Sequence, residues 1–197
     1  QQYESMGLQH LNNIEYAFDG PEVQGYMDEC LFELQEMMWF AQVNREENNK
    51  LHTYKLFKRD FLPEFYLQLP LSRKERKALA QLRCGVAPLR IETGRWENKN
   101  GQRTIAEERY CQFCAKSGQN MVEDEKHFLL ECAHPGLSQH RLELFERARN
   151  FRPDFDSFSN QEKLVYVLAN EDIIFFSARI CAKMLNIRSD VSRDDFL

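Results

Sequence analysis

The chain has 197 residues, of which 43% are apolar and 12% aromatic, and its formal net charge is −5. This composition excludes an intrinsically disordered chain, and eight Gly with six Pro are too few for the turns of an all-β sandwich. Charged residues interrupt the most hydrophobic region, 164–185, before it reaches the roughly 18 apolar residues that a membrane span needs, so we expect no membrane-spanning segment and a mainly α fold.

The first expected helix follows Pro21, which suits the first position of a helix, and runs from about residue 22 to 47. Met27, Cys30, Leu34 and Met37 recur in it at helical spacing. We expect this amphipathic face to pack in a core or against a partner protein, including a second copy of the chain, rather than to form a cofactor site. Helix continues over 51–61, and two prolines then bracket a connector.

Three Ser/Thr-x-x-Glu capping boxes predict helix starts at Ser72, Thr104 and Ser159. In such a box the Ser or Thr hydroxyl accepts the backbone amide of the glutamate, and the glutamate carboxylate accepts the backbone amide of the Ser or Thr. The helix from Ser72 ends at Gly85, and residues 91–100 are expected to form a loop or short strand. Further helices are predicted over 135–150 and from Ser159, and Asn170 caps the last, most apolar helix. The expected regions are an acidic helical region 1–71, a basic region 72–150 and a helical pair 151–197. The basic region contains residues 111–132, with three cysteines and one histidine, which we call the finger.

Charge is uneven along the chain: residues 1–54 carry −8, residues 55–116 carry +7 and residues 117–197 carry −4. An excess of Lys and Arg in one segment is typical of a surface that binds phosphates. A solvated helix face explains residues 73–77 equally simply. The candidate nucleic-acid contacts in the basic segment are Arg73, Lys74, Arg76, Lys77, Arg83, Arg90, Arg95, Arg103 and Arg109.

The sequence places Cys111 and Cys114 two residues apart, then, after twelve residues, His127 and Cys132. Three thiolates and one imidazole are the ligands that tetrahedral zinc takes in closed structural sites, so we predict one structural Zn²⁺. Five helical steps turn a residue about 140° away, and Cys132 must therefore lie at or beyond the end of a helix carrying His127. His134 could replace either of these two ligands, and a reduced Cys-x-x-Cys with an unrelated histidine is the other alternative.

Six cysteines could instead form three disulfides in a secreted chain. Cys30 and Cys181 lie in apolar helical patterns and Cys84 lies beside Gly85, however, and a reduced cysteine in such places behaves as a small buried hydrophobe. The sequence begins with Gln1-Gln2 and shows no secretory leader. We expect an intracellular protein, nuclear or cytoplasmic, and a segment of a longer polypeptide.

Three stretches carry a resemblance to a known family: Leu89 to Trp96, which contains Glu-Thr-Gly-Arg-Trp, Glu108 to Cys114, and Val122 to Cys132. Together they resemble the cysteine-rich segment that follows the reverse transcriptase domain in the second open reading frame of animal non-LTR retrotransposons. The similarity covers about residues 50–145. It implies a nucleic-acid-binding accessory that helps a polymerase engage its RNA template or target DNA.

The resemblance does not imply catalysis in this segment. A Tyr-x-Asp-Asp signature is missing from the sequence, and Asp194-Asp195 lacks the apolar strand of a polymerase site. Some relatives place a restriction-like endonuclease after the same finger, and Arg152-Pro-Asp154 fits its first letters. Because Glu162-Lys163 has the wrong spacing and lies in an expected helix, we predict that the segment is not an enzyme.

Two functions remain open from the sequence. In the first, the finger fixes the basic residues as a positive surface, and Trp96, Tyr110 or Phe113 stacks on unpaired bases, although such aromatics more often form a finger's own core. In the second, the chain is a protein-interaction or scaffold domain, a former mobile-element segment now serving a host, as the acidic flanks and the 22–47 helix favour.

Overall fold

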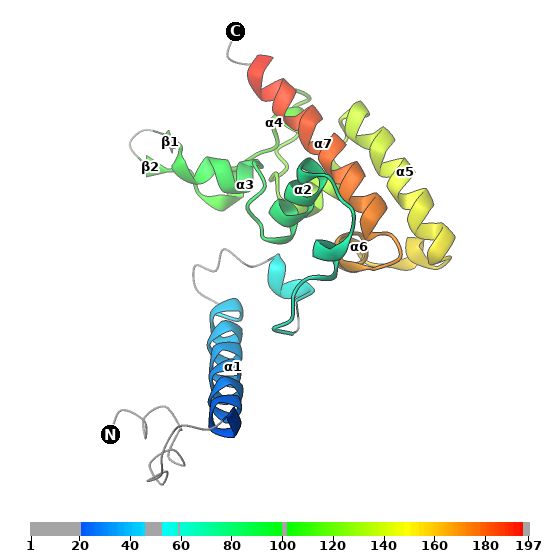
Figure 1. The fold of residues 1–197 in the computed structure, drawn as a ribbon. Helices are drawn as coiled ribbons and strands as arrows, with labels where there is room; N and C mark the ends of the chain where they lie inside the picture. The colour runs from blue at the N-terminus through cyan, green and yellow to red at the C-terminus, as the bar shows by residue number, and fades with distance from the viewer. Residues whose placement is uncertain (1–20, 46–52, 59, 100–101, 195–197) are drawn as a thin grey trace. The chain divides into compact units, whose positions relative to one another are not determined.

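The computed structural model describes residues 21–45, 53–58, 60–99 and 102–194 (Figure 1). The chain divides between Gln42 and Val43 into two compact units. The mainly helical fold predicted from the sequence is confirmed. The principal elements are α1 (Pro21–Val43), α2 (Arg73–Arg83), α3 (Arg90–Thr93), β1 (Asn98–Lys99), β2 (Gln102–Arg103), α4 (Gln112–Ala115), α5 (Pro135–Phe151), α6 (Asn160–Ala169) and α7 (Ile174–Asp194).

Short turns connect these elements. The 3-10 helices are Tyr54–Leu56, Phe65–Gln68, Gly94–Trp96, Ala106–Glu108 and Phe155–Ser157, and one π-helical turn covers His127–Glu131. Within the part of the chain that the structure describes, no helix has the length and apolar character to cross a bilayer.

The core of the second unit is built around α7. Figure 1 shows this helix running between α2 and α5, and both helices pack against it, with α6 closing the cluster. The side chains of Ile174, Ala178, Cys181 and Met184 recur at helical spacing along α7 and are almost completely buried. Leucines from the neighbouring helices complete the core, among them Leu79, Leu82, Leu137, Leu144, Leu164 and Leu168.

This packing moves the expected region boundaries. The boundaries at 71/72 and 150/151 both fall inside the second unit, which begins at Val43. The reason is that α2, from the expected basic region, shares its apolar face with α7, from the expected C-terminal pair. Elements far apart in the sequence therefore form one core.

Two of the three capping boxes are formed. The hydroxyls of Ser72 and Ser159 accept the amides of Glu75 and Glu162, whose carboxylates accept the serine amides in return, at the starts of α2 and α6. The Thr104 box is not formed, because the Thr104 hydroxyl donates to the carbonyl of Glu97, and the short helix at Ala106 begins without a side-chain cap. A helical turn is nevertheless present there.

Several element boundaries differ from expectation. The first helix ends at Val43, and residues 46–47 lie outside the described residues. Asn170 caps the end of α6, while its side chain accepts the Asp172 amide and α7 begins only at Ile174. The loop or short strand expected over 91–100 is present in part: β1 pairs with β2 in an antiparallel register that puts Lys99 opposite Gln102, but α3 and a 3-10 turn precede it.

The helix expected over 51–61 is reduced to a single 3-10 turn in its described part. Tertiary contacts outweigh local helix propensity here. The hydroxyl of Thr53 donates to buried Glu125 at 3.2 Å, and the Arg83 guanidinium lies over the rings of Phe57 and Tyr66. The contacts of Thr53 and Phe57 hold the segment against Glu125 and against Arg83 of α2.

Arg83 is a structural residue, and we remove it from the candidate nucleic-acid contacts. Only 3% of its surface is exposed. Its guanidinium donates to the carbonyl of Leu168 at 2.5 Å and pairs with the Glu64 carboxylate. Burial lowers the pKa of Arg83, and the Glu64 charge opposes that shift. Arg83 thus links Glu64 to α6. Its guanidinium is buried and therefore inaccessible to a phosphate.

We predict that Arg83→Ala lowers the free energy of unfolding by about 3 kcal/mol, because it leaves the Glu64 carboxylate without its closest cation. Lys77→Ala, at an exposed position of the same helix, should change it by less than about 0.5 kcal/mol. Urea denaturation followed by circular dichroism measures both, and equal effects would contradict a structural role for Arg83.

Candidate metal centre

The four predicted ligands lie together. Cys111, Cys114, His127 and Cys132 are all buried, and their ligand atoms all lie within 4.8 Å of one another. The Cys132 sulfur is 3.8 Å from that of Cys111 and 3.9 Å from that of Cys114, and the Cys114 sulfur is 3.4 Å from His127 Nε2. Sulfurs about 2.3 Å from a common tetrahedral zinc would lie about 3.8 Å apart. The cluster therefore has the dimensions of a metal site.

Local structure places the two ligand pairs. Cys111 precedes α4 and Cys114 lies in it, so one helical turn points both sulfurs to the same side. The Cys111 amide donates to the Met121 carbonyl, and a bridge between Tyr110 and Val122 brings the second half of the finger alongside. The first pair is thus held by backbone contacts that extend beyond the Cys-x-x-Cys turn itself.

The second pair is set by the π-helical turn. Helical residues 125–126 lead into this turn, and the Asp124 carboxylate caps their start by accepting the His127 amide at 2.7 Å. The Cys132 amide then donates to the His127 carbonyl at 2.7 Å, a five-residue step wider than that of an α-helix. Cys132 follows the last helical residue, as the sequence predicts, and its backbone leaves the helical conformation.

The donor chemistry also fits a metal. The neighbouring Cys132 thiol and burial raise the pKa of Cys111 to about 12. Burial also raises the pKa of Cys114, although the Ala133 amide opposes that shift. The Cys111 thiol lowers the pKa of Cys132, and the His134 amide adds to this effect. A divalent cation that displaced the thiol protons would bind sulfurs that the Ala133 and His134 amides already contact. These residues can therefore hold a structural metal.

His134 is not part of the ligand cluster. Its ring lies 4.1 Å from the ring of Phe113, centroid to centroid, and burial lowers the pKa of its imidazole. Phe113 is itself buried in the core, so the structure uses it for packing and leaves no face for a base. Nor do disulfides compete for the ligands, since all six cysteines lie among the described residues and all are unpaired.

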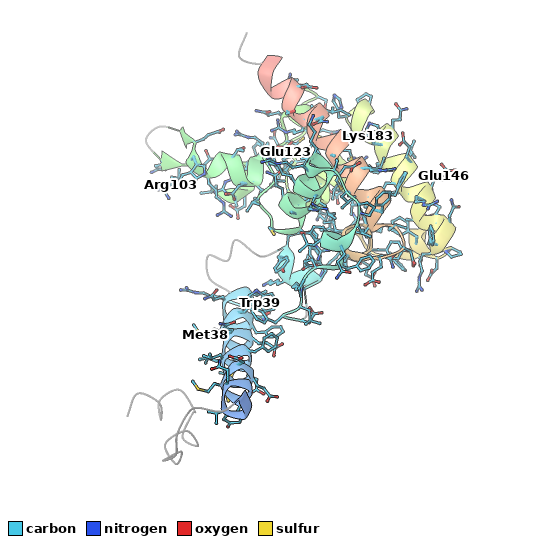
Figure 2. The ribbon with its side chains drawn as sticks, in the orientation of Figure 1. Met38, Trp39, Arg103, Glu123, Glu146 and Lys183 are labelled. Atoms are coloured by element: carbon cyan, nitrogen blue, oxygen red, sulfur yellow. The ribbon has the colours of Figure 1, made fainter. Side chains whose placement is uncertain are left out.

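A buried carboxylate, Glu123, connects the finger to the helical core. Its side chain, labelled in Figure 2, is completely buried. It accepts from the Arg188 guanidinium of α7 at 2.6 and 3.0 Å. The same carboxylate accepts the Arg90 amide at 2.8 Å and lies 3.8 Å from the Cys111 sulfur. Sequence reasoning missed this pair, because 65 residues separate the partners and neither residue has a motif around it.

Arg141 supports the finger from α5. Its guanidinium donates to the carbonyls of Leu129 and Cys132, both at 2.8 Å. These groups belong to the π-turn and its end, where carbonyls have no partner within the turn. Burial lowers the pKa of Arg141, but the nearby Cys132 sulfur and Glu131 carboxylate favour its charged form. Arg141 lies near the Cys132 and Cys114 sulfurs, and its positive charge would balance the net negative charge of three thiolates with one divalent ion.

The finger also positions a segment that we call the arm: residues 90–99 and 102–105, with α3, the Gly94–Trp96 turn, β1 and β2. The Arg109 guanidinium donates to the carbonyls of Ile91 and Thr104, and Glu123 exchanges backbone hydrogen bonds with Arg109 and Ile91. A Cβ at Gly94 would lie 2.8 Å from Cγ of Arg109, so glycine is required for the close approach. Figure 1 shows β1 and β2 of the arm on the side of the second unit that lies away from α5 and α7.

Most predicted nucleic-acid contacts have partners within the chain. Arg90 pairs with Glu97, Arg95 pairs with Glu92, and Arg76 donates to the Leu69 carbonyl. With Arg83 and Arg109, five of the nine predicted cations therefore serve the fold. The remaining cations, with the predicted aromatic, are exposed: Arg73, Lys74, Lys77, Arg103 and Trp96.

Comparison with known proteins adds no family. The sequence matches no protein-family model, and neither a curated protein nor a solved structure shows significant similarity to it.

We predict that the purified chain contains one metal ion, and that Cys111→Ser and Cys132→Ser both lose it because each removes one of four converging ligands. Cys84→Ser is the control, since Cys84 lies outside the cluster at the end of α2. Elemental analysis of the folded protein measures the stoichiometry. Retention of the ion by both ligand variants would exclude this site.

We predict that Arg188→Leu costs about 3–5 kcal/mol of stability, because it leaves the Glu123 carboxylate buried without its cation. Adding Glu123→Gln should restore part of this loss, since the uncompensated charge is then removed. Chemical denaturation of the single and double variants measures the effect. A double variant that is less stable by the sum of both single losses would contradict the proposed pairing.

Proposed function

We propose that this chain is a non-catalytic module that binds single-stranded nucleic acid through α2 and the arm, with one structural zinc ion holding the arm in place. The observation that carries the proposal is a set of exposed cations, Arg73, Lys74, Lys77 and Arg103, that have no acidic partner among the described residues. A cation without an internal partner is free to pair with a phosphate.

Zinc is the ion that the donor set favours. Three thiolates and an imidazole at tetrahedral spacing suit a borderline-soft cation with no geometric preference of its own. Four protein ligands fill the coordination sphere and leave no position for an activated water. This closed donor set supports a structural role, and with it the proposal that the segment is not an enzyme.

The first binding element is the start of α2. Arg73, Lys74 and Lys77 lie exposed in its first turns, where the free backbone amides of the helix end add positive potential. The one acidic residue among them, Glu75, is occupied by the Ser72 cap and by Arg179, which lies 3.3 Å away. The net charge of this helix start is therefore positive.

The second binding element is the arm. Trp96 is 69% exposed, the largest exposed fraction among the exposed large hydrophobic side chains of the described residues. Arg103, labelled in Figure 2, lies on β2 of the same arm. An indole that is not needed for packing can stack on an unpaired base, which contributes about 1–3 kcal/mol per base, while Arg103 pairs with the backbone.

Zinc acts on binding indirectly in this proposal. The ion fixes Cys111. Near it, Arg109 donates to a carbonyl of the arm and Glu123 accepts an amide of the arm, and these bonds fix the arm that carries Trp96. The resemblance of the Glu-Thr-Gly-Arg-Trp stretch and the finger to a retrotransposon segment supports the same function. On that basis we propose an RNA template or target DNA as the ligand, and a nuclear or cytoplasmic site of action.

A protein-interaction role is the second candidate. The observation that favours it is α1, on which Tyr26, Met27, Leu31, Met37 and Met38 are all more than 40% exposed. Exposed apolar side chains on one helix are typical of a surface that binds protein.

We predict salt-dependent binding to single-stranded oligonucleotides, with log K falling against log salt at a slope of about −3 for four phosphate contacts. Lys74→Ala and Arg103→Ala should each make the slope shallower by about 0.7, and Trp96→Ala should weaken binding about tenfold or more without changing the slope. Fluorescence anisotropy over a salt series measures all three variants.

The control is Arg149→Ala, which removes an exposed cation already paired with Asp156 at 2.8 Å. It should leave affinity and slope unchanged. Absence of binding at low salt, or an effect of Arg149→Ala as large as that of Lys74→Ala, would contradict the proposal.

A further inference from the structure

The apolar face of α1 has a regular spacing. Val23, Met27, Cys30, Leu34, Met37 and Ala41 follow one another at intervals of four, three, four, three and four residues. This is an uninterrupted heptad pattern, with Met27, Leu34 and Ala41 at a positions and Val23, Cys30 and Met37 at d positions. A 3.5-residue period matches a helix that winds around another helix.

The flanking positions favour the same arrangement. Leu31 and Met38 occupy e positions, Tyr26 and Phe40 occupy g positions, and these side chains widen the apolar stripe on both sides. Among the acidic residues, Asp28, Glu29 and Glu36 lie at b and c positions, away from the seam, and α1 contains no Lys or Arg. An identical helix could therefore join along the stripe without bringing these three carboxylates together.

We propose that α1 joins a second copy of this chain as a parallel two-stranded coiled coil. The inference names the partner for the second candidate function and does not rest on nucleic-acid binding. The 23-residue helix is about 35 Å long, and two copies joined along the stripe would bury on the order of 1,000 Å², the lower limit for a specific interface. We therefore expect a dissociation constant in the micromolar range.

Glu33 decides the orientation. It occupies a g position, and in the antiparallel register that aligns the two stripes fully, Glu33 of one copy lies beside Glu33 of the other. In the parallel arrangement it faces Met38 of the partner copy, and Tyr26 faces the partner copy's Leu31. Like charges therefore disfavour the antiparallel pair, and the parallel pair places the two Cys30 side chains in the same d layer.

Analytical ultracentrifugation of the full chain tests the proposal with two matched variants. Met37→Glu places a carboxylate at a seam position that is 66% exposed, and Phe32→Glu places the same group at an f position that is 47% exposed. The wild type should dimerise at tens of micromolar, Met37→Glu should raise the dissociation constant at least tenfold, and Phe32→Glu should change it less than twofold. Because both residues lie in the first unit, circular dichroism and metal content should confirm that the second unit stays folded.

Thiol cross-linking tests the orientation. Mild oxidation with diamide, which is reduced as two thiols form a disulfide, should cross-link the wild-type dimer through Cys30, and Cys30→Ser should abolish the covalent dimer. A monomeric wild type, or equal effects of Met37→Glu and Phe32→Glu, would overturn the proposal. A dimer that is not cross-linked through Cys30 would overturn the parallel arrangement. Loss of salt-dependent oligonucleotide binding affects neither outcome.

Discussion

The convergence of three sulfurs and one imidazole is the constraint that organises the finger and, through Glu123 and Arg109, its contacts with α7 and the arm. Residues 105–127 contain little that is apolar, and a metal ion can give this polar segment a fixed shape that burial of its few apolar side chains would not. Two sets of contacts connect the finger to its surroundings. Glu123 binds Arg188 of α7, and Arg109 donates to the Ile91 carbonyl of the arm.

Hydrogen bonds within the fold explain why several arginines of the basic segment, residues 55–116, have structural roles. Arg76, Arg83 and Arg109 each donate to backbone carbonyls at the ends of helices or in irregular turns. A fold with so many short helices has many such carbonyls, and arginine satisfies several of them at once because its donors form a fixed fork. Much of the positive charge of residues 55–116 is therefore paired within the fold, and only some of its cations are exposed at the surface.

This division also marks how far sequence reasoning could go. The ligand spacing, two capping boxes and the position of Cys132 beyond its helix were predictable, because each depends on residues close together in the chain. The roles of Arg83, Glu123 and Thr53 were not, because their partners lie 85, 65 and 72 residues away. Thr104 shows the same limit: its motif is complete, but Glu97, seven residues earlier, accepts its hydroxyl instead.

Hydrogen exchange with and without a chelator tests most directly whether the metal holds the arm as well as the finger. The amide of Ile91 donates to the Glu123 carbonyl and that of Thr104 to the Glu97 carbonyl, so both report on the arm at a distance from the ligands. On metal removal these two amides should lose protection together with that of Cys132. If Cys132 lost protection while Ile91 and Thr104 kept theirs, the arm would be stable without the metal, which contradicts the role proposed for the ion.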